Sequence, residues 1–435
     1  MLRRPLVLVA WLLCLPGWSA DWPQYRGPNR DDNSADKGLL KKWPAGGPRL
    51  VWTYGDAGVG YSGLAIVGNR LYTIGGRGDS EFLIALDLAA AKDGKVAEAW
   101  TVKVGPLFTG YKGNSWSAGP SATPTVDGEL VFALGGNGDL VCVDAGSGKE
   151  RWRKNLPADL DAQINPIGGG PKNLGWGFTW SPLVDGDRLI CALGGPKGTL
   201  AALDKKTGQV QWRSAEVKDQ ATYTSPMRAE IDGVPQFVYL TNQGLFGVDA
   251  KDGKVLWNVR KTPAYSTEVV NTPLVRGGLV WTTVGSGAGS GSELVKVAPD
   301  GGKFQPEQVY LNKGLANHHG NVVLVGDHVY GFSQGGGWVC QELQSGKVVW
   351  SERQKHRAGS VTYADGRLYC YGEDDGTTVL IEASPEGWKE AGRFKIPQQS
   401  KQRKPQGKVW TPPVVANGKL YLRDQDLLFC FDIKE

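Results

Sequence analysis

The chain has 435 residues, of which 40% are hydrophobic and 21% charged, and its 62 glycines and 25 prolines are spread throughout. This density of turn-forming residues excludes long helices, and the 17 tryptophans argue against a disordered chain. The formal net charge of +5 includes Arg3 and Arg4 and leaves no broad basic surface, so we expect no binding to nucleic acid. The composition suits many short strands joined by tight turns.

Residues 1–20 have the pattern of a secretory signal peptide. Arg3 and Arg4 precede an apolar run over residues 6–15, and the small residues Ser19 and Ala20 follow. No other segment approaches the roughly 20 apolar residues needed to span a bilayer. The sequence therefore predicts export to the periplasm or the cell exterior without a transmembrane anchor. The bulky Trp18 leaves the cleaved bond open, and an uncleaved anchor is the alternative.

Beyond an N-terminal extension at residues 21–48, the chain is built from a repeat. Residues 121–154 resolve into four alternating apolar runs separated by turns, which predicts a four-stranded antiparallel meander, and the unit recurs at 179–214 and 224–259. Hairpin-type dipeptides recur about every fifty residues and predict eight propeller blades. They are Gly68-Asn69, Asp127-Gly128, Asp185-Gly186, Asp232-Gly233, Gly277-Gly278, Gly326-Asp327, Asp365-Gly366 and Asn417-Gly418.

Two further positions recur in register with these turns. The third run of most units ends in a carboxylate, which we interpret as scaffold, because an Asp ahead of a glycine turn accepts backbone N–H bonds. The fourth run carries an aromatic residue that we expect to wedge between blades. These residues are Trp100, Trp152, Trp212, Trp257 and Trp350, with Tyr310 and Phe394 as substitutes.

The eighth unit lacks a fourth run, whereas the unpaired run at residues 49–54 carries the missing aromatic residue, Trp52. We expect residues 49–54 to pair with residues 419–433, because closing the ring removes two exposed strand edges. The prediction is an all-β fold. Residues 49–435 form an eight-bladed propeller of four-stranded antiparallel blades, closed by an N-terminal strand.

The pattern ALDxxTGxxxW, seen as Ala202-Leu203-Asp204 with Thr207-Gly208 and Trp212, resembles the repeat of pyrroloquinoline-quinone-like (PQQ-like) β-propellers. The resemblance covers essentially the whole chain after residue 20. Residues 21–30 (DWPQYRGPNR), 317–320 (NHHG) and 408–411 (KVWT) are similar to a secreted subgroup of that family from planctomycete-type genomes. The resemblance specifies the fold more closely than the function.

Two kinds of PQQ-like propeller define the functions that this resemblance implies. The quinone-dependent alcohol dehydrogenases hold PQQ and calcium over the channel, commonly above two adjacent cysteines, and the chain has no Cys-Cys pair. The BamB family of outer-membrane assembly lipoproteins is non-enzymatic, but the lipid-bearing cysteine is missing here. We expect a monomeric, non-catalytic binding or scaffold protein of the cell envelope, without a cofactor. A PQQ-dependent dehydrogenase-like oxidoreductase is the alternative.

The predicted binding face is the one on which the connections are long, at residues 105–120, 157–177, 285–292 and 397–407. We expect an envelope protein, a polymer or a small ligand at the channel mouth on this face. The candidate ligand-binding residues are Trp176, Trp180, Asn271, His318, His319 and Trp410. The competing interpretation is that these side chains only plug the channel and stiffen the ring.

Several other features are interpreted as structural, and no catalytic residue or metal site is predicted. Alternation along a strand should keep His318 and His319 from both facing the channel, which argues against a metal clamp. The five cysteines after residue 20 are expected to be buried, and His328 and His356 to lie on the surface. Residues 373–375 and 393–408 are expected to be solvated. Hydroxyl residues that begin the first strands, such as Ser181 and Ser225, should bind channel water.

Overall fold

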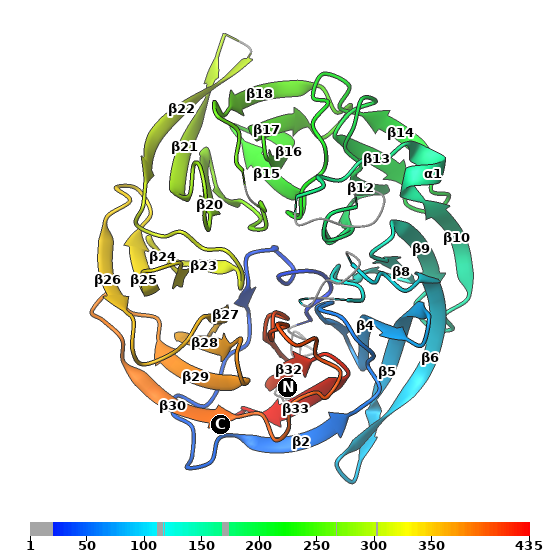
Figure 1. Cartoon of the computed structure of the whole chain (residues 1–435), viewed down its shortest axis with the longest axis vertical. Helices are drawn as coiled ribbons and strands as arrows, with labels where there is room; N and C mark the ends of the chain where they lie inside the picture. Colours follow the sequence, from blue (N-terminus) through cyan, green and yellow to red (C-terminus); the bar gives the residue numbers. More distant parts are fainter. Residues whose placement is uncertain (1–20, 111–115, 117, 168–173, 267, 302) are drawn as a thin grey trace, which may run out of the picture.

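The computed structural model describes residues 21–435 except 111–115, 117, 168–173, 267 and 302. Within these residues, eight blades of four antiparallel strands follow one another around a ring (Figure 1), and one of these sheets has a fifth, parallel strand, β1 (Asn33–Ser34). This arrangement confirms the predicted all-β, eight-bladed propeller. The signal peptide predicted at residues 1–20 lies outside the described residues, as do residues 111–115, 117 and 168–173 of the predicted binding loops.

The blades take their strands in chain order from the centre of the ring outward. Blade 1 contains β3 (Ala65–Val67), β4 (Arg70–Arg77), β5 (Ser80–Lys92) and β6 (Lys95–Pro106). Blade 2 contains β7 (Thr125–Asp127), β8 (Leu130–Leu134), β9 (Asp139–Asp144) and β10 (Glu150–Asn155). Blade 3 contains β11 (Leu183–Asp185), β12 (Arg188–Ala192), β13 (Leu200–Asp204) and β14 (Val210–Arg213), and blade 4 contains β15 (Met227–Ile231), β16 (Val234–Thr241), β17 (Gly244–Asp249) and β18 (Val255–Arg260). A short helix, α1 (Leu156–Leu160), follows blade 2.

Blade 5 contains β19 (Leu274–Arg276), β20 (Leu279–Val284), β21 (Gly291–Asp300) and β22 (Lys303–Asn312), and blade 6 contains β23 (Val322–Val325), β24 (His328–Ser333), β25 (Gly337–Glu342) and β26 (Val348–Glu352). Blade 7 contains β27 (Gly359–Ala364), β28 (Arg367–Gly372), β29 (Thr377–Glu382) and β30 (Glu390–Lys395). Blade 8 contains β31 (Val414–Ala416), β32 (Lys419–Asp424), β33 (Leu427–Asp432) and, as its outermost strand, the N-terminal β2 (Arg49–Tyr54). In the described part of the chain, no helix is both long and apolar enough to cross a membrane.

The N-terminal strand β2 closes the ring as predicted. It pairs antiparallel with β33, from Arg49 opposite Asp432 to Tyr54 opposite Leu428. A second fastening joins blade 8 to blade 1, because the buried Arg423 guanidinium donates to the carbonyls of Ser62 at 2.9 Å and Gly58 at 3.1 Å. The closure thus depends on residues from both ends of the chain.

The recurring sequence pattern has a direct structural reason. The carboxylate of Asp204 accepts from the backbone N–H of Thr207 at 2.8 Å and orders the turn that follows β13. Trp152 of the preceding blade donates its indole N–H to the Lys205 carbonyl at 3.0 Å and packs on Gly208, where a Cβ would lie 2.9 Å from the ring. The aromatic wedge and the scaffold role of the carboxylates are confirmed at this junction.

Hydroxyl groups at the starts of the inner strands join neighbouring blades. The backbone N–H of Thr123 donates to Oγ of Ser181, and the backbone N–H of Ser181 donates to Oγ of Ser225. The backbone N–H of Ser225 donates in turn to Oγ1 of Thr272, and the three distances are 2.9–3.0 Å. All four residues are buried. In blades 3 to 5 these hydroxyls therefore link one blade to the next, and their binding of channel water stays a prediction.

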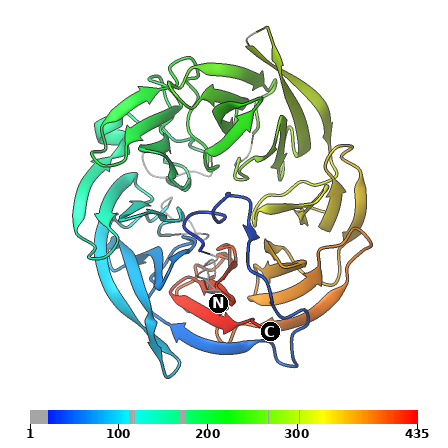
Figure 2. The same cartoon turned by 180° about the vertical axis from the view of Figure 1, so that it is seen from behind.

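The N-terminal extension crosses the centre of the ring on the face seen in Figure 2. Trp22 pairs with Ile66 of blade 1 at 2.7 Å, and the short strand β1 (Asn33–Ser34) runs parallel to β27 of blade 7. Further along, Leu40 donates to the Ile433 carbonyl at 2.8 Å. One end of the channel is thereby covered by a segment that contacts the neighbouring blades 7, 8 and 1.

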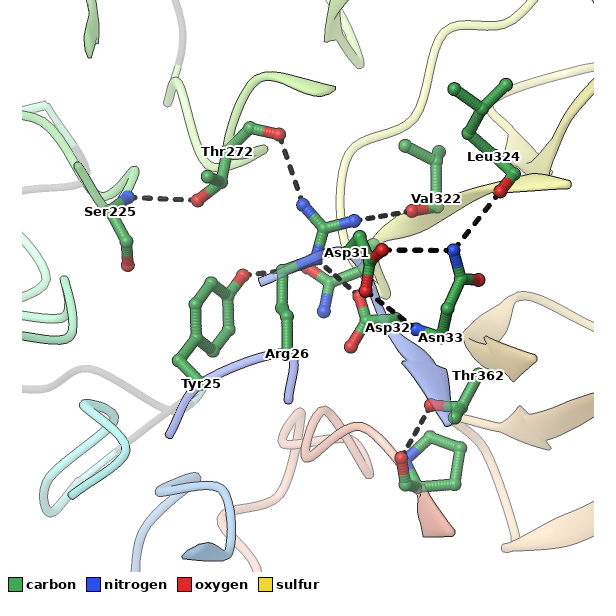
Figure 3. Close-up of polar contacts among 12 residues, drawn as sticks. Tyr25, Arg26, Asp31, Asp32, Asn33, Ser225, Thr272, Val322, Leu324 and Thr362 are labelled. Atoms are coloured by element: carbon green, nitrogen blue, oxygen red, sulfur yellow. Dashed lines mark hydrogen bonds and ion pairs between the residues drawn. The ribbon is translucent and has the colours of Figure 1, made fainter. Parts of the chain in front are cut away.

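Two buried arginines attach this extension to the inner strands. Arg30 donates to the carbonyls of Ser181 at 2.8 Å and Pro182 at 2.9 Å. Figure 3 shows Arg26, which donates to the Val322 carbonyl at 2.6 Å. It also forms an ion pair with Asp32 at 2.5 Å. Burial lowers the pKa of Arg30 to about 9 and raises that of Asp32 to about 6.

Three minor predictions have different outcomes. The five cysteines of the described chain are buried and free, which confirms their packing role. His356 is not on the surface: it is buried, and its ring stacks on Trp338 with centroids 5.8 Å apart. Within the basic run at 393–408, Arg403 pairs with the buried Asp424 at 2.5 Å, so the run is solvated only in part.

Candidate functional site

A cavity of about 500 Å³ lies at the other end of the channel. Tyr25 of the N-terminal extension reaches its inner end, and its hydroxyl donates to Asn321 Oδ1 at 2.9 Å. The connections that lead into the inner strands supply the rest of the wall. The described aromatic and imidazole side chains that line it are Tyr25, Tyr61, Trp116, Trp176, Tyr223, His318, His319, Phe332 and Trp410.

The structure brings four of the six predicted residues together around this cavity: Trp176, His318, His319 and Trp410. The other two point elsewhere. Trp180 is fully buried and packs in the core cluster that blades 2 to 4 share. Asn271 is also buried, and its Nδ2 donates to the Asn317 carbonyl at 2.9 Å. Both residues therefore fasten the scaffold instead of lining the cavity.

The two adjacent histidines both face the cavity, so the expectation that they diverge is wrong. Strand alternation does not apply, because residues 313–321 form an irregular segment that ends before β23. The rings of His318 and His319 lie 4.0 Å apart between centroids, and His319 stacks on Trp410 at 4.9 Å. Burial lowers the pKa of both histidines, to about 3 for His319, so the imidazoles are neutral at pH 7.

The Trp410 ring is the centre of an aromatic group on one side of the cavity. Its centroid lies 5.2 Å from that of Tyr61 and 6.4 Å from that of Trp116, whose ring is nearly parallel to it. The Tyr61 hydroxyl donates to the Trp116 carbonyl at 3.0 Å. This packing leaves Trp116 with 43% of its surface exposed at the mouth, which is unusual for an indole.

Two carboxylates face the cavity, each bonded to an indole. Glu268 Oε1 accepts from Trp176 Nε1 at 3.2 Å, and its other oxygen lies 3.9 Å from His318 Nε2. Glu373 Oε2 accepts from Trp410 Nε1 at 3.0 Å, and burial raises the pKa of Glu373. The prediction of a solvated acidic turn is therefore wrong for Glu373, whose carboxylate points inward.

Several lining residues escaped the sequence prediction. Tyr223 lies two residues ahead of Ser225, which the repeat placed at the start of an inner strand, and Tyr61 lies one residue ahead of Ser62, the equivalent residue of blade 1, so the same rule would have found both tyrosines. Tyr25 gave no such signal, because its position depends on how the extension crosses the ring. Phe108, in a predicted binding loop, is buried against Gly136 instead.

The described lining residues do not match a site for PQQ and calcium. Pyrroloquinoline quinone is a polyanion, yet the one lysine or arginine among them, Lys408, already pairs with Asp374 at 2.6 Å. Calcium takes six to eight oxygen ligands. Among the residues that the structure describes, no three His, Cys, Asp or Glu side chains are grouped to hold a metal ion.

Comparisons with known proteins agree with the propeller fold. The family model described as outer membrane protein assembly factor BamB matches residues 80–352 and, in an overlapping match, 275–388. BamB of Shewanella oneidensis is 25% identical over 244 residues, which cover 53% of this chain and 56% of that protein. BamB of Burkholderia pseudomallei is 25% identical over 326 residues, 65% of this chain and 79% of that protein. The chain thus spans little more than half the length of the first relative.

Solved structures show the same architecture at low identity. BamB from Moraxella catarrhalis superposes with a TM-score of 0.58 and 14% identity, covering 89% of this chain and all of that one. A europium-containing methanol dehydrogenase gives a TM-score of 0.60 and 13% identity, covering 93% and 89%. These likenesses concern the fold alone. The family model matches well over half of the chain, and this match confirms the resemblance read from the repeat. The protein therefore belongs to the family of outer membrane protein assembly factor BamB.

Proposed function

We propose that the protein is a non-catalytic binding protein of the bacterial envelope, acting as a monomer, which holds an envelope partner at the mouth of its aromatic cavity. One observation carries this proposal: Glu268, Glu373 and His319, which face the cavity, each contact an aromatic side chain of its wall. Glu268 and Glu373 accept indole N–H bonds, and His319 is a neutral ring stacked on Trp410. Such walls suit recognition better than proton or group transfer.

The family gives independent support. The curated relatives are named as outer membrane protein assembly factors, and we carry this name over as a scaffold role for this chain. Carried over to this chain, that role uses the looped face, because long connections and an exposed indole gather there. Export by residues 1–20 is part of the proposal.

Site-specific photo-crosslinking in living cells tests it. A photoreactive amino acid at Gln334, which is exposed at the cavity mouth, should give a discrete crosslink to an envelope protein. The matched control is Asp187, exposed at the β11–β12 turn, where no such crosslink should form. Equal crosslinking at both positions would contradict a defined binding face.

Enzymatic turnover would overturn the proposal directly. Purified protein should show no dye-linked alcohol oxidation after incubation with PQQ and Ca²⁺, whereas a quinone-dependent dehydrogenase should. Cell fractionation adds a third measurement, because the protein should be recovered from the envelope fractions. Recovery from the cytoplasm with residues 1–20 intact would contradict export.

A further inference from the structure

The charge around the cavity is unbalanced. Glu268 and Glu373 both face it, and neither is paired with a cation among the described residues. Lys408, the one cationic side chain of the described lining, is held by Asp374. Because an indole N–H occupies one oxygen of each glutamate, each carboxylate keeps further lone pairs for a donor from outside. The cavity therefore attracts a positively charged group.

The remaining lining strengthens this preference. Indole and phenol rings present electron-rich faces that attract ammonium and guanidinium groups, and Trp is the best of them. Three indoles, three phenols and one phenyl ring line the described part of the cavity. His318 and His319 add neutral rings and no positive charge. The aromatic faces and the two carboxylates thus select the same kind of group.

The size of the cavity defines what accompanies that group. A volume of about 500 Å³ falls in the range of pockets that enclose a whole small ligand or several side chains. Since the N-terminal extension occupies one end, a ligand enters from the looped face and stops near Tyr25. A bare ammonium ion would leave most of the aromatic wall uncovered, so the cation needs an apolar body.

We infer that the cavity binds an organic cation, an ammonium or guanidinium group on an apolar body, between Glu268 and Glu373. The source that fits the proposed function, on which this inference rests, is an Arg or Lys side chain in an extended segment of the partner. A free quaternary ammonium compound has the same chemistry. A neutral oligosaccharide, which could also stack on the indoles, would be bound without regard to the carboxylates.

Isothermal titration of the full-length mature protein distinguishes these ligands. The probes are acetyl-Leu-Arg-Leu-amide, the same peptide with neutral citrulline in place of arginine, benzyltrimethylammonium and maltohexaose. We expect the arginine peptide to bind at least tenfold more tightly than the citrulline peptide. Tight binding of benzyltrimethylammonium alone would keep the cation chemistry and reject the peptide source. Binding of maltohexaose alone, or of no probe, would overturn the inference.

Carboxamide variants locate the effect. The double variant Glu268→Gln, Glu373→Gln should lose at least tenfold in affinity for the arginine peptide and keep its affinity for the citrulline peptide. Glu307→Gln, an exposed position on β22, is the matched control and should change neither. Glutamine retains an oxygen for the indole N–H, so all variants should melt within a few degrees of the native protein. An unchanged arginine affinity in a folded double variant would contradict the inference.

The Gln334 crosslink separates this inference from the proposed function. The crosslink to the envelope partner could persist in the double variant while the native protein binds the arginine and citrulline peptides equally. The protein is then a scaffold whose cavity does not select a positively charged group. If the crosslink is missing in the native protein although the arginine peptide binds, the cavity chemistry stands and the scaffold role fails.

Discussion

The two ends of the central channel bury charged groups in opposite ways. At the end covered by the N-terminal extension, the guanidinium groups of Arg26 and Arg30 are enclosed and donate to inner-strand carbonyls. At the looped end, Glu268 and Glu373 are only partly engaged and face an open cavity. A buried charge that donates to main-chain carbonyls of other blades holds the fold together. A charge left partly unmatched beside a cavity is available to a ligand.

Deletion of residues 21–54 should have the largest effect, because it removes both the extension and the closing strand β2. The outer edge of β33 would be exposed, and the buried carbonyls of Ser181 and Val322 would lose their arginine partners. We expect aggregation or loss of the cooperative melting transition, measured by size-exclusion chromatography and circular dichroism. A truncated chain that melts like the native protein would show that the covered end is dispensable.

Two tryptophans four residues apart separate scaffold from site. Trp180→Ala should lower the free energy of unfolding by about 3–5 kcal/mol, because the indole is fully buried in the core. Trp176→Ala should mainly weaken binding of the arginine peptide, because its indole lines the cavity and holds Glu268. Urea unfolding and calorimetric titration of both variants measure the two effects. If Trp176→Ala loses only stability, the aromatic residues merely plug the channel.

Arg30→Met tests the covered end on its own. The variant leaves the buried Ser181 carbonyl without its donor, so we expect unfolding to become easier by about 1–3 kcal/mol in urea. Affinity for the arginine peptide should stay the same, since Arg30 does not line the cavity. Lys401→Met, at an exposed position, is the control and should stay within about 0.5 kcal/mol of the native protein. A parallel loss of binding would mean that the two ends are coupled.

The pH dependence of binding should give the smallest effect. Burial raises the pKa of Glu373 above its ordinary value of 4.5, and the nearby Asp374 also raises it. Trp410 and Lys408 act in the opposite direction and lower this pKa. As the pH falls, the negative charge of Glu373 is therefore lost at a higher pH than that of an ordinary glutamate. Affinity for the arginine peptide should decline severalfold between pH 7 and pH 5, measured by titration. The citrulline peptide and the Glu373→Gln variant should show a flatter profile.

The repeat made the fold predictable because each blade is specified locally. Asp204 orders its own turn, and Trp152 needs only the glycine of the next unit, so short sequence patterns contain the information. The ring closure followed from counting strands. What the sequence could not give was the course of the N-terminal extension, because Tyr25 meets Asn321 across 296 residues and belongs to no repeat.

The candidate site was predictable in part for the same reason. Trp176 stands in a connection that the repeat marks as long, Trp410 lies three residues after another, and both reach the cavity. Trp180 was predicted wrongly, because it follows the same connection as Trp176 but its side chain points into the core. The histidine pair was misread since strand alternation was applied to a segment that is not a strand. Glu373 was predicted to be solvated, because the sequence of a charged turn does not indicate where each carboxylate points.

The course of the extension has a consequence for how the molecule comes into being. Leu39 and Leu40 bind beside Ile433 and Lys434, and Arg49 opposes Asp432, so the segment that closes the ring pairs with the last residues of the chain. Contacts of such long sequence separation form late and slowly in folding. A nascent chain cannot complete this architecture while its final blade is still missing. Assembly of the ring therefore waits for the whole polypeptide, a timing compatible with passage across a membrane as an unfolded thread.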